Sequence, residues 1–104
     1  MVYELLIIPG CPHGVPALEL FRAALAAEGR NAEPVQVREV VSESEASALH
    51  FQGSPTFMTA GRDLFPVNSA PALSCRLYRS DEGVAGLPSA AALRAALRNV
   101  GSEA

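Results

Sequence analysis

Hydrophobic residues in the first part of the chain change from strand-like to helical spacing and back again. A short aliphatic run from Tyr3 to Ile8 ends at Pro9, which is typical of a buried strand. From Pro16 onward apolar residues recur at helical spacing until Gly29, and this pattern predicts the first helix. Valines then alternate in part with polar side chains over 35–41, which predicts a second strand with one face in water.

The middle of the chain predicts a short helix followed by a strand. Ser42 and Glu45 have the spacing of a capping box, so we expect a helix to start after Ser42 and to end before Gly53. The run from Pro55 to Ala60 predicts the third strand. The residues from Gly61 to Asp63 then predict a turn.

The last third of the chain predicts one more strand and one more helix. Leu73 to Tyr78 can form a fourth strand, and the residues from Ser80 to Gly86 predict a turn. Pro88 and Ser89 are typical of a helix start. The apolar residues that follow at helical spacing predict one buried face: Leu93, Ala96, Leu97 and Val100.

The order of these elements predicts an α/β fold with a four-stranded mixed sheet. The first two strands and the helix between them form a right-handed βαβ unit with parallel strands. The third strand should run antiparallel beside the first, which brings together two loops, Pro9 to Gly14 and Gly53 to Thr56. With 104 residues and 49% hydrophobic residues, we expect residues 1–104 to form a single domain.

Cys11 is the candidate reactive group, because it lies just before the first helix. The positive end of a helix and its unpaired N–H groups favour a thiolate over a thiol. His13 could add positive charge or a hydrogen bond. Pro16 weakens this expectation, since the regular helix would then begin near Val15, further from the thiol. The alternative is that Cys11 is an inert small residue in a tight turn.

The second cysteine, Cys75, is expected to be a small buried hydrophobic residue. It lies near the start of the predicted fourth strand, and therefore at the end of the sheet opposite Cys11. A strand of five residues spans about 17 Å, whereas disulfide-bonded cysteines need Cα atoms within about 7 Å. We therefore expect that the two cysteines cannot pair, unless the loop from Pro66 to Pro71 folds back across the sheet.

Two short motifs resemble those of the thioredoxin-like superfamily. Cys11, Pro12, His13 and Gly14 follow the first strand, where these proteins carry Cys-x-x-Cys, and the sequence Gly-Ser-Pro-Thr at 53–56 resembles their cis-proline loop. Cys-Pro-His is similar to the motif Cys-Pro-His-Cys of bacterial periplasmic disulfide oxidases. Gly14 replaces the second cysteine, so the motif is a monothiol variant.

The chain is also similar to small actinobacterial thioredoxin-like proteins, some of which are labelled alkylmercury lyase. They share the Gly-Ser-Pro-Thr loop and a Ser-Cys-Arg-Leu-Tyr stretch, found here at 74–78. Both resemblances imply a minimal thioredoxin-like fold, made of a βαβ unit, a short helix, a β-hairpin and a C-terminal helix. They also imply two catalytic residues, Cys11 and His13, and four substrate-binding residues: Pro12, Ser54, Pro55 and Thr56.

Composition and charge narrow the expected partners. The formal net charge is −3 and no basic run occurs, so neither nucleic acid nor a membrane is expected as a partner. The first residues lack a basic segment and a cleavage pattern, and the apolar run is short, so we expect a cytoplasmic protein with reduced thiols. Two cysteines without clustered spacing predict no zinc site, and no cofactor motif is recognisable.

Three functions are compatible with these features. The leading expectation is thiol-disulfide exchange through Cys11 with a small thiol or a partner protein, resolved by an outside thiol or by Cys75. The second is a redox-inactive binding module whose groove between Cys11 and Ser54 to Pro55 pairs with an extended segment. The third is capture of a soft metal ion such as mercury or copper(I) by the Cys11 thiolate. The expected separation from Cys75 excludes a two-cysteine metal site.

Overall fold

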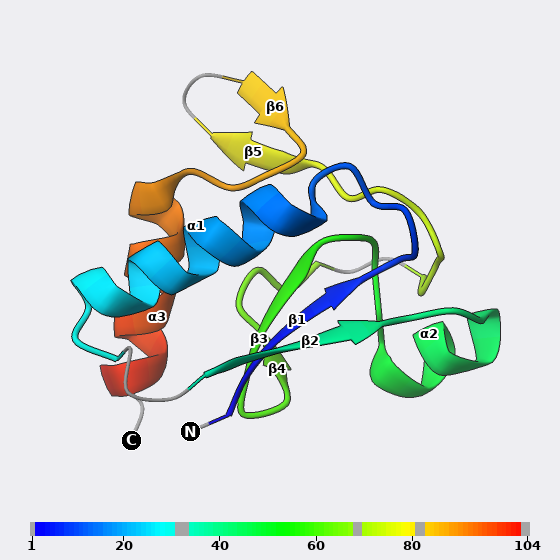
Figure 1. The fold of residues 1–104 in the computed structure, drawn as a ribbon, viewed down its shortest axis with the longest axis horizontal. Helices are drawn as coiled ribbons and strands as arrows, with labels where there is room; N and C mark the ends of the chain where they lie inside the picture. The colour runs from blue at the N-terminus through cyan, green and yellow to red at the C-terminus, as the bar shows by residue number, and fades with distance from the viewer. Residues whose placement is uncertain (1, 31–33, 68–69, 81–82, 103–104) are drawn as a thin grey trace.

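The central sheet contains four strands in the order β2-β1-β3-β4 (Figure 1). The computed structural model describes residues 2–30, 34–67, 70–80 and 83–102. β1 (Tyr3–Ile7) pairs in parallel with β2 (Val35–Glu39) and antiparallel with β3 (Thr56–Thr59), which pairs antiparallel with β4 (Arg62–Asp63). The expected α/β class, the mixed four-stranded sheet and the strand directions are thereby confirmed.

Helices cover both faces of this sheet. Helices α1 (Gly14–Ala27) and α3 (Ala90–Ser102) pack on one face, and α2 (Glu43–Leu49) lies against the other (Figure 1). Successive residues of a strand point to opposite faces. Leu5 accordingly packs with α1 and α3, whereas Leu6 packs in the smaller cluster beside α2.

The larger core contains a chain of aromatic rings on the face of the sheet that α1 covers. The ring centroids of Phe21 and Phe57 lie 5.2 Å apart, in the edge-to-face arrangement that aromatic quadrupoles favour. Tyr78 joins from beyond the sheet, 6.0 Å from Phe57. The face predicted for the last helix is confirmed, because its four apolar residues belong to this core: Leu93, Ala96, Leu97 and Val100.

Polar side chains start two of the helices as expected. The Ser42 hydroxyl accepts a hydrogen bond from the Glu45 backbone N–H at 3.1 Å, which satisfies one of the free donors at the start of α2. The Ser89 hydroxyl likewise accepts from the Ala92 N–H at 3.0 Å, before α3. Helix α1 differs, because its N-cap is His13 and no side chain caps it.

Three predictions for the segment after β3 are wrong. Arg62 and Asp63 form strand β4 rather than a turn, since the chain already reverses at 60–61. Leu73 to Tyr78 adds no strand to the sheet. Instead β5 (Tyr78–Ser80) pairs with β6 (Gly83–Ala85) in a separate hairpin, which occupies part of the predicted 80–86 turn, residues 81–82 lying outside the described residues.

The physical reason lies in the alternation of side chains over 73–78. Leu73 and Leu77 are 36% and 69% exposed, although both are large apolar residues. The buried positions are taken by Arg76 and Tyr78, each 5% exposed. The segment is therefore held by contacts of Arg76 and Tyr78 rather than by burial of its leucines.

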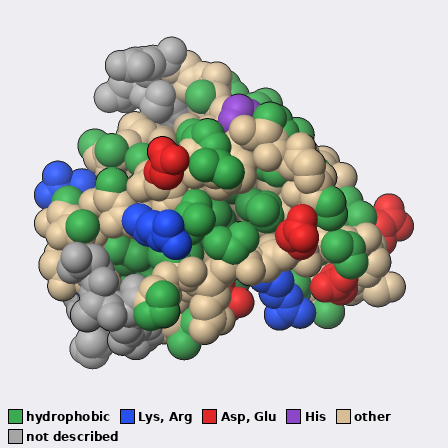
Figure 2. All heavy atoms as spheres, viewed as in Figure 1, with side chains coloured by type: hydrophobic (Ala, Val, Ile, Leu, Met, Phe, Trp, Pro, Cys, Tyr) green, Lys and Arg blue, Asp and Glu red, His purple; other side chains and the backbone are tan. Residues whose placement is uncertain are grey.

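Charges of both signs are mixed on one face of the molecule. Arginine and acidic side chains are scattered over the face drawn in Figure 2, with hydrophobic side chains between them. In the described part of the chain, no helix combines the length and the apolar character needed to cross a membrane.

Candidate functional site

The two loops that the topology was expected to bring together do meet at Cys11. The Ser54 hydroxyl lies 2.9 Å from the Cys11 Sγ and donates to it. The same hydroxyl accepts a hydrogen bond from the Ile8 N–H at 3.2 Å, at the end of β1. Ser54 is fully buried, and the Ser54–Pro55 peptide bond is cis, the isomer that the resemblance implied.

Cys11 lies in a tight turn before α1 rather than in its first turn. The Cys11 N–H donates to the Ile8 carbonyl at 3.2 Å, and the Gly14 N–H donates to the Cys11 carbonyl at 3.2 Å. The helix begins at Gly14, so Cys11 precedes the N-cap by two residues and its thiol is half-buried. The effect of the helix dipole falls off within the first turn, which makes Ser54 the group that acts most directly on this sulfur.

The His13 ring lies against Gly86. A Cβ atom added at Gly86 would lie 2.4 Å from the His13 Nε2, so the imidazole packs against the backbone that follows β6. Within the described residues, the ring makes no hydrogen bond to Cys11. His13 is thus close to Cys11 in the sequence, but the two side chains share no hydrogen bond within the described residues.

The expected substrate-binding residues divide into one exposed and three buried positions. Pro12 is exposed beside Cys11. Ser54, Pro55 and Thr56 are all less than 2% exposed. The Thr56 hydroxyl donates to the Gly53 carbonyl at 2.6 Å, and the Pro55 carbonyl accepts from the Tyr78 hydroxyl. A partner can therefore contact Pro12 directly, whereas the other three are covered.

The cover over this loop is the segment 74–78. The Ser54 N–H donates to the Ser74 carbonyl at 2.8 Å, and the Arg76 N–H donates to the Ser54 carbonyl at 2.9 Å. These bonds make a parallel bridge in which Cys75 lies directly opposite Ser54. A Cβ atom at Gly53 would lie 2.8 Å from the Arg76 Cβ, so the close approach of the two chains requires glycine there.

The expectations for Cys75 are therefore wrong in two respects. Its thiol is exposed rather than buried. It also lies beside Ser54, at the same end of the sheet as Cys11, because the chain folds back after β4 and pairs with the loop that precedes β3. The predicted separation of the two cysteines, which argued against a disulfide or a shared metal ion, is therefore wrong.

Arg76 anchors the segment and was missed by the sequence analysis. Its Nη1 donates to Asp63 Oδ2 at 2.7 Å and to the Thr56 hydroxyl at 3.3 Å, and its Nη2 donates to the Phe65 carbonyl. The guanidinium carbon lies 4.8 Å from the centroid of the Tyr78 ring, a cation–π distance. The only sequence signal was the resemblance of 74–78 to a recurring stretch, which gives no role for the arginine.

Tyr78 is the second anchor. Its hydroxyl donates to the Pro55 carbonyl, and burial raises the pKa of the phenol well above its ordinary value. The phenol is therefore a neutral donor throughout the physiological range. Arg76 and Tyr78 together hold the segment over the loop at 53–56.

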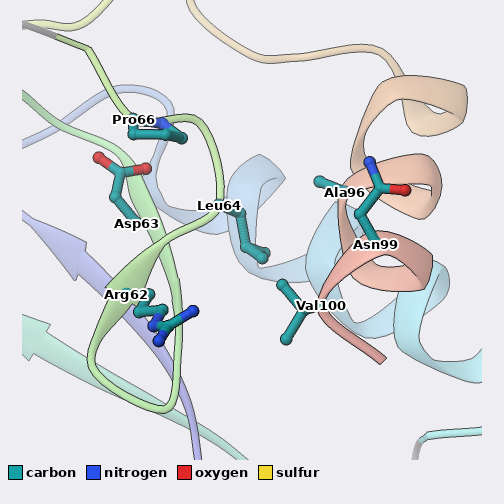
Figure 3. Close-up of a pocket in the computed structure, with 7 residues that line it drawn as sticks. All are labelled: Arg62, Asp63, Leu64, Pro66, Ala96, Asn99 and Val100. Atoms are coloured by element: carbon teal, nitrogen blue, oxygen red, sulfur yellow. The ribbon is translucent and has the colours of Figure 1, made fainter. Parts of the chain in front are cut away.

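Two surface pockets are lined by residues other than the cysteines. One, of about 270 Å³, lies between β4 and α3, with Leu64 and Val100 pointing toward one another across it (Figure 3). Another, of about 350 Å³, is bordered by Phe65, Leu77 and Tyr78. Neither is lined by Cys11 or Ser54, so neither belongs to the thiol site.

The described residues contain no cluster of three or more histidine, cysteine or acidic side chains able to hold a metal ion. No protein-family model, curated protein or solved structure matches this chain.

Proposed function

We propose that the protein exchanges thiols and disulfides through Cys11, with a small thiol or a partner protein as the reactant. The observation that carries the proposal is the 2.9 Å contact between the Ser54 hydroxyl and the Cys11 sulfur. Exchange proceeds by attack of a thiolate on a disulfide sulfur, so the attacking and leaving sulfurs both carry negative charge. A hydroxyl that donates to Cys11 stabilises that charge in either role.

Access to the sulfur also supports the proposal. Cys11 is half-buried rather than enclosed, and Pro12 beside it is exposed, so part of this turn is open to a small disulfide. The donor to the sulfur belongs to the fully buried Ser54 and is therefore shielded from water.

The occupied backbone of Ser54 argues against a non-covalent strand-binding module. Its N–H and carbonyl groups are both bonded within the chain, to Ser74 and Arg76. An extended partner could pair there only after the segment 74–76 had left. Reaction at the Cys11 thiol requires no such rearrangement.

The test is the reaction of each thiol with glutathione disulfide, with the modified site assigned by mass spectrometry. We expect Cys11 to react faster than Cys75, although Cys75 is the more exposed thiol. Ser54→Ala should slow the Cys11 reaction by roughly tenfold or more, because a hydrogen bond to a charged group contributes about 1.5–3 kcal/mol. Its effect on Cys75 should be small.

A matched control separates this effect from a general loss of stability. Ser42→Ala removes the cap of α2, which costs about 1 kcal/mol, and it should leave the Cys11 rate unchanged. The proposal fails if Cys11 reacts no faster than Cys75 and Ser54→Ala changes nothing.

Capture of a soft metal ion is the second candidate, favoured by the position of both cysteines beside Ser54. Two thiolates suit copper(I) or mercury better than hard cations. A titration with copper(I), followed by the thiolate-to-metal charge-transfer absorption, should give one equivalent in the native chain. Both Cys11→Ser and Cys75→Ser should abolish this binding, and its persistence in either variant excludes the two-thiolate site.

A further inference from the structure

Ser54 contacts both cysteine-bearing segments of the chain. Its hydroxyl donates to the Cys11 sulfur at 2.9 Å. Its backbone N–H and carbonyl groups bond to Ser74 and Arg76, the two neighbours of Cys75 in the chain. Cys11 and Cys75 are separated by 64 positions in the sequence but by one intervening residue in space. Both thiols are free in the structure.

The bridge also determines where the Cys75 side chain emerges. Residues directly opposite each other in a β-bridge project their side chains to the same face, with Cβ atoms about 5 Å apart. Cys75 therefore emerges on the face of the bridge from which the Ser54 side chain reaches Cys11. A cysteine at Leu77, two residues further along, would be displaced by about 7 Å.

We propose that Cys75 is the resolving thiol for Cys11. This inference rests on the proposed function and identifies the thiol that completes the exchange. Gly14 occupies the position where the resolving cysteine of a Cys-x-x-Cys motif would lie. Cys75, supplied from a distant part of the chain, takes over that role from the other side of Ser54.

The reaction balances with a disulfide, RSSR, as the oxidant. The Cys11 thiolate attacks one sulfur, forms the mixed disulfide Cys11–S–S–R and releases one thiolate, RS⁻. The Cys75 thiolate then attacks the Cys11 sulfur, breaks the mixed disulfide and releases the second RS⁻. The two protons lost by the cysteines leave with the two released thiols. Two electrons pass from the cysteine pair to RSSR, and an external dithiol restores the pair by the reverse steps.

The segment that carries Cys75 can close the remaining distance to Cys11. Disulfide formation requires Cα atoms within about 7 Å. Residues 70–75 are exposed and belong to no helix or strand. Two backbone hydrogen bonds hold them, from the Ser54 N–H to the Ser74 carbonyl and from the Ala72 N–H to the Phe51 carbonyl. A short movement of 70–75 toward Cys11 breaks these two bonds and leaves the buried anchors Arg76 and Tyr78 in place.

The test is the fate of the Cys11 mixed disulfide after a pulse of glutathione disulfide, followed by acid quenching and mass spectrometry. An intramolecular thiol acts at an effective concentration on the order of millimolar. In about 0.1 mM external thiol, the native chain should therefore resolve the mixed disulfide at least about tenfold faster than Cys75→Ser. Digestion of the native product should yield one linked peptide pair containing Cys11 and Cys75.

The control returns a thiol to the same segment in the wrong register. Cys75→Ser combined with Leu77→Cys should remain as slow as Cys75→Ser alone. Equal lifetimes of the mixed disulfide in the native chain and in Cys75→Ser overturn the inference and leave the proposed function standing. Disulfides formed between chains, seen on non-reducing gels, also overturn it. Failure of Cys11 to form any mixed disulfide overturns the proposed function and this inference together.

Discussion

The guanidinium of Arg76 lies 2.7 Å from the carboxylate of Asp63, and these side chains are 4% and 15% exposed. The ion pair joins the segment over the thiol site to the last strand of the central sheet. Removing one partner of a buried pair leaves the other charge without compensation, which is far more costly than losing an exposed pair.

Arg76→Met should therefore lower the free energy of unfolding by about 3–5 kcal/mol. Arg94→Met is the matched control, because the Arg94 side chain is 45% exposed and pairs with Glu28 on the surface. Its cost should be at most about 1 kcal/mol. Urea denaturation of both variants measures the difference, and equal costs would show that the Arg76 pair is not buried in solution.

Thr59→Val should raise the stability of the protein. Its hydroxyl is buried and, within the described residues, has no hydrogen-bond partner, so replacing it by a methyl group removes a desolvation cost of about 1 kcal/mol or more. Thr56→Val should do the opposite, because that hydroxyl bonds to both Gly53 and Arg76. Thermal unfolding of the two variants should show shifts of opposite sign.

Gly53→Ala should displace the segment 74–76 from Ser54. The added Cβ would lie 2.8 Å from the Arg76 Cβ, and the φ angle of +119° is unfavourable for alanine. Gly29→Ala is the control, since its φ is +71° with no atom within 4 Å of the added carbon, so only the backbone cost of about 1–2 kcal/mol applies. Amide exchange at Ser54 and Arg76 should accelerate in Gly53→Ala alone.

Gly14→Cys, made with Cys75→Ser, should allow a disulfide between positions 11 and 14. The hydrogen bond from the Gly14 N–H to the Cys11 carbonyl closes a four-residue turn, in which the end Cα atoms lie within about 7 Å. The added Cβ would lie 3.4 Å from Ile7 Cδ1, a contact that a flexible side chain can accommodate. Oxidation should link the new thiol to Cys11, and a product with two free thiols would contradict this geometry.

The contact between α1 and α3 should weaken in acid. Arg94, which donates to the Glu28 carboxylate at 2.8 Å, holds the pKa of Glu28 below its ordinary value of 4.5. A lowered pKa stabilises the folded state above the unfolded-state pKa, and this contribution disappears as the pH falls through the folded-state value. The Tm difference between the native chain and Glu28→Gln should thus be largest at neutral pH and vanish in strong acid.

Much of the fold was predictable because local patterns and topology agree. The alternation through Leu5 and Leu6 matches the two faces of the sheet, and Ser42 caps α2 as its spacing indicates. The meeting of the loops that carry Cys11 and Ser54 followed from strand directions, since adjacent antiparallel strands bring the end of one beside the start of the other.

The segment 74–78 was not predictable by the same reasoning. A period of two shows that neighbours face opposite sides, but it does not show which side is buried. The distant carboxylate of Asp63 makes burial of Arg76 favourable, and no local pattern indicates that partner. Cys75 was predicted at the opposite end of the sheet because 73–78 was expected to be a strand that follows a hairpin, whereas the chain folds back and pairs with the loop before β3.

The phenol of Tyr78 gives this protein an optical reporter of its own. The chain has no tryptophan and two tyrosines, and both tyrosines are buried, Tyr3 at 4% and Tyr78 at 5% exposure. Ionisation of Tyr78 removes the hydrogen bond that its hydroxyl donates to the Pro55 carbonyl, so the appearance of its phenolate marks the loss of one anchor of the segment over the loop. An alkaline spectroscopic titration of Tyr3→Phe, in which Tyr78 is the remaining tyrosine, therefore follows the release of this anchor without a label.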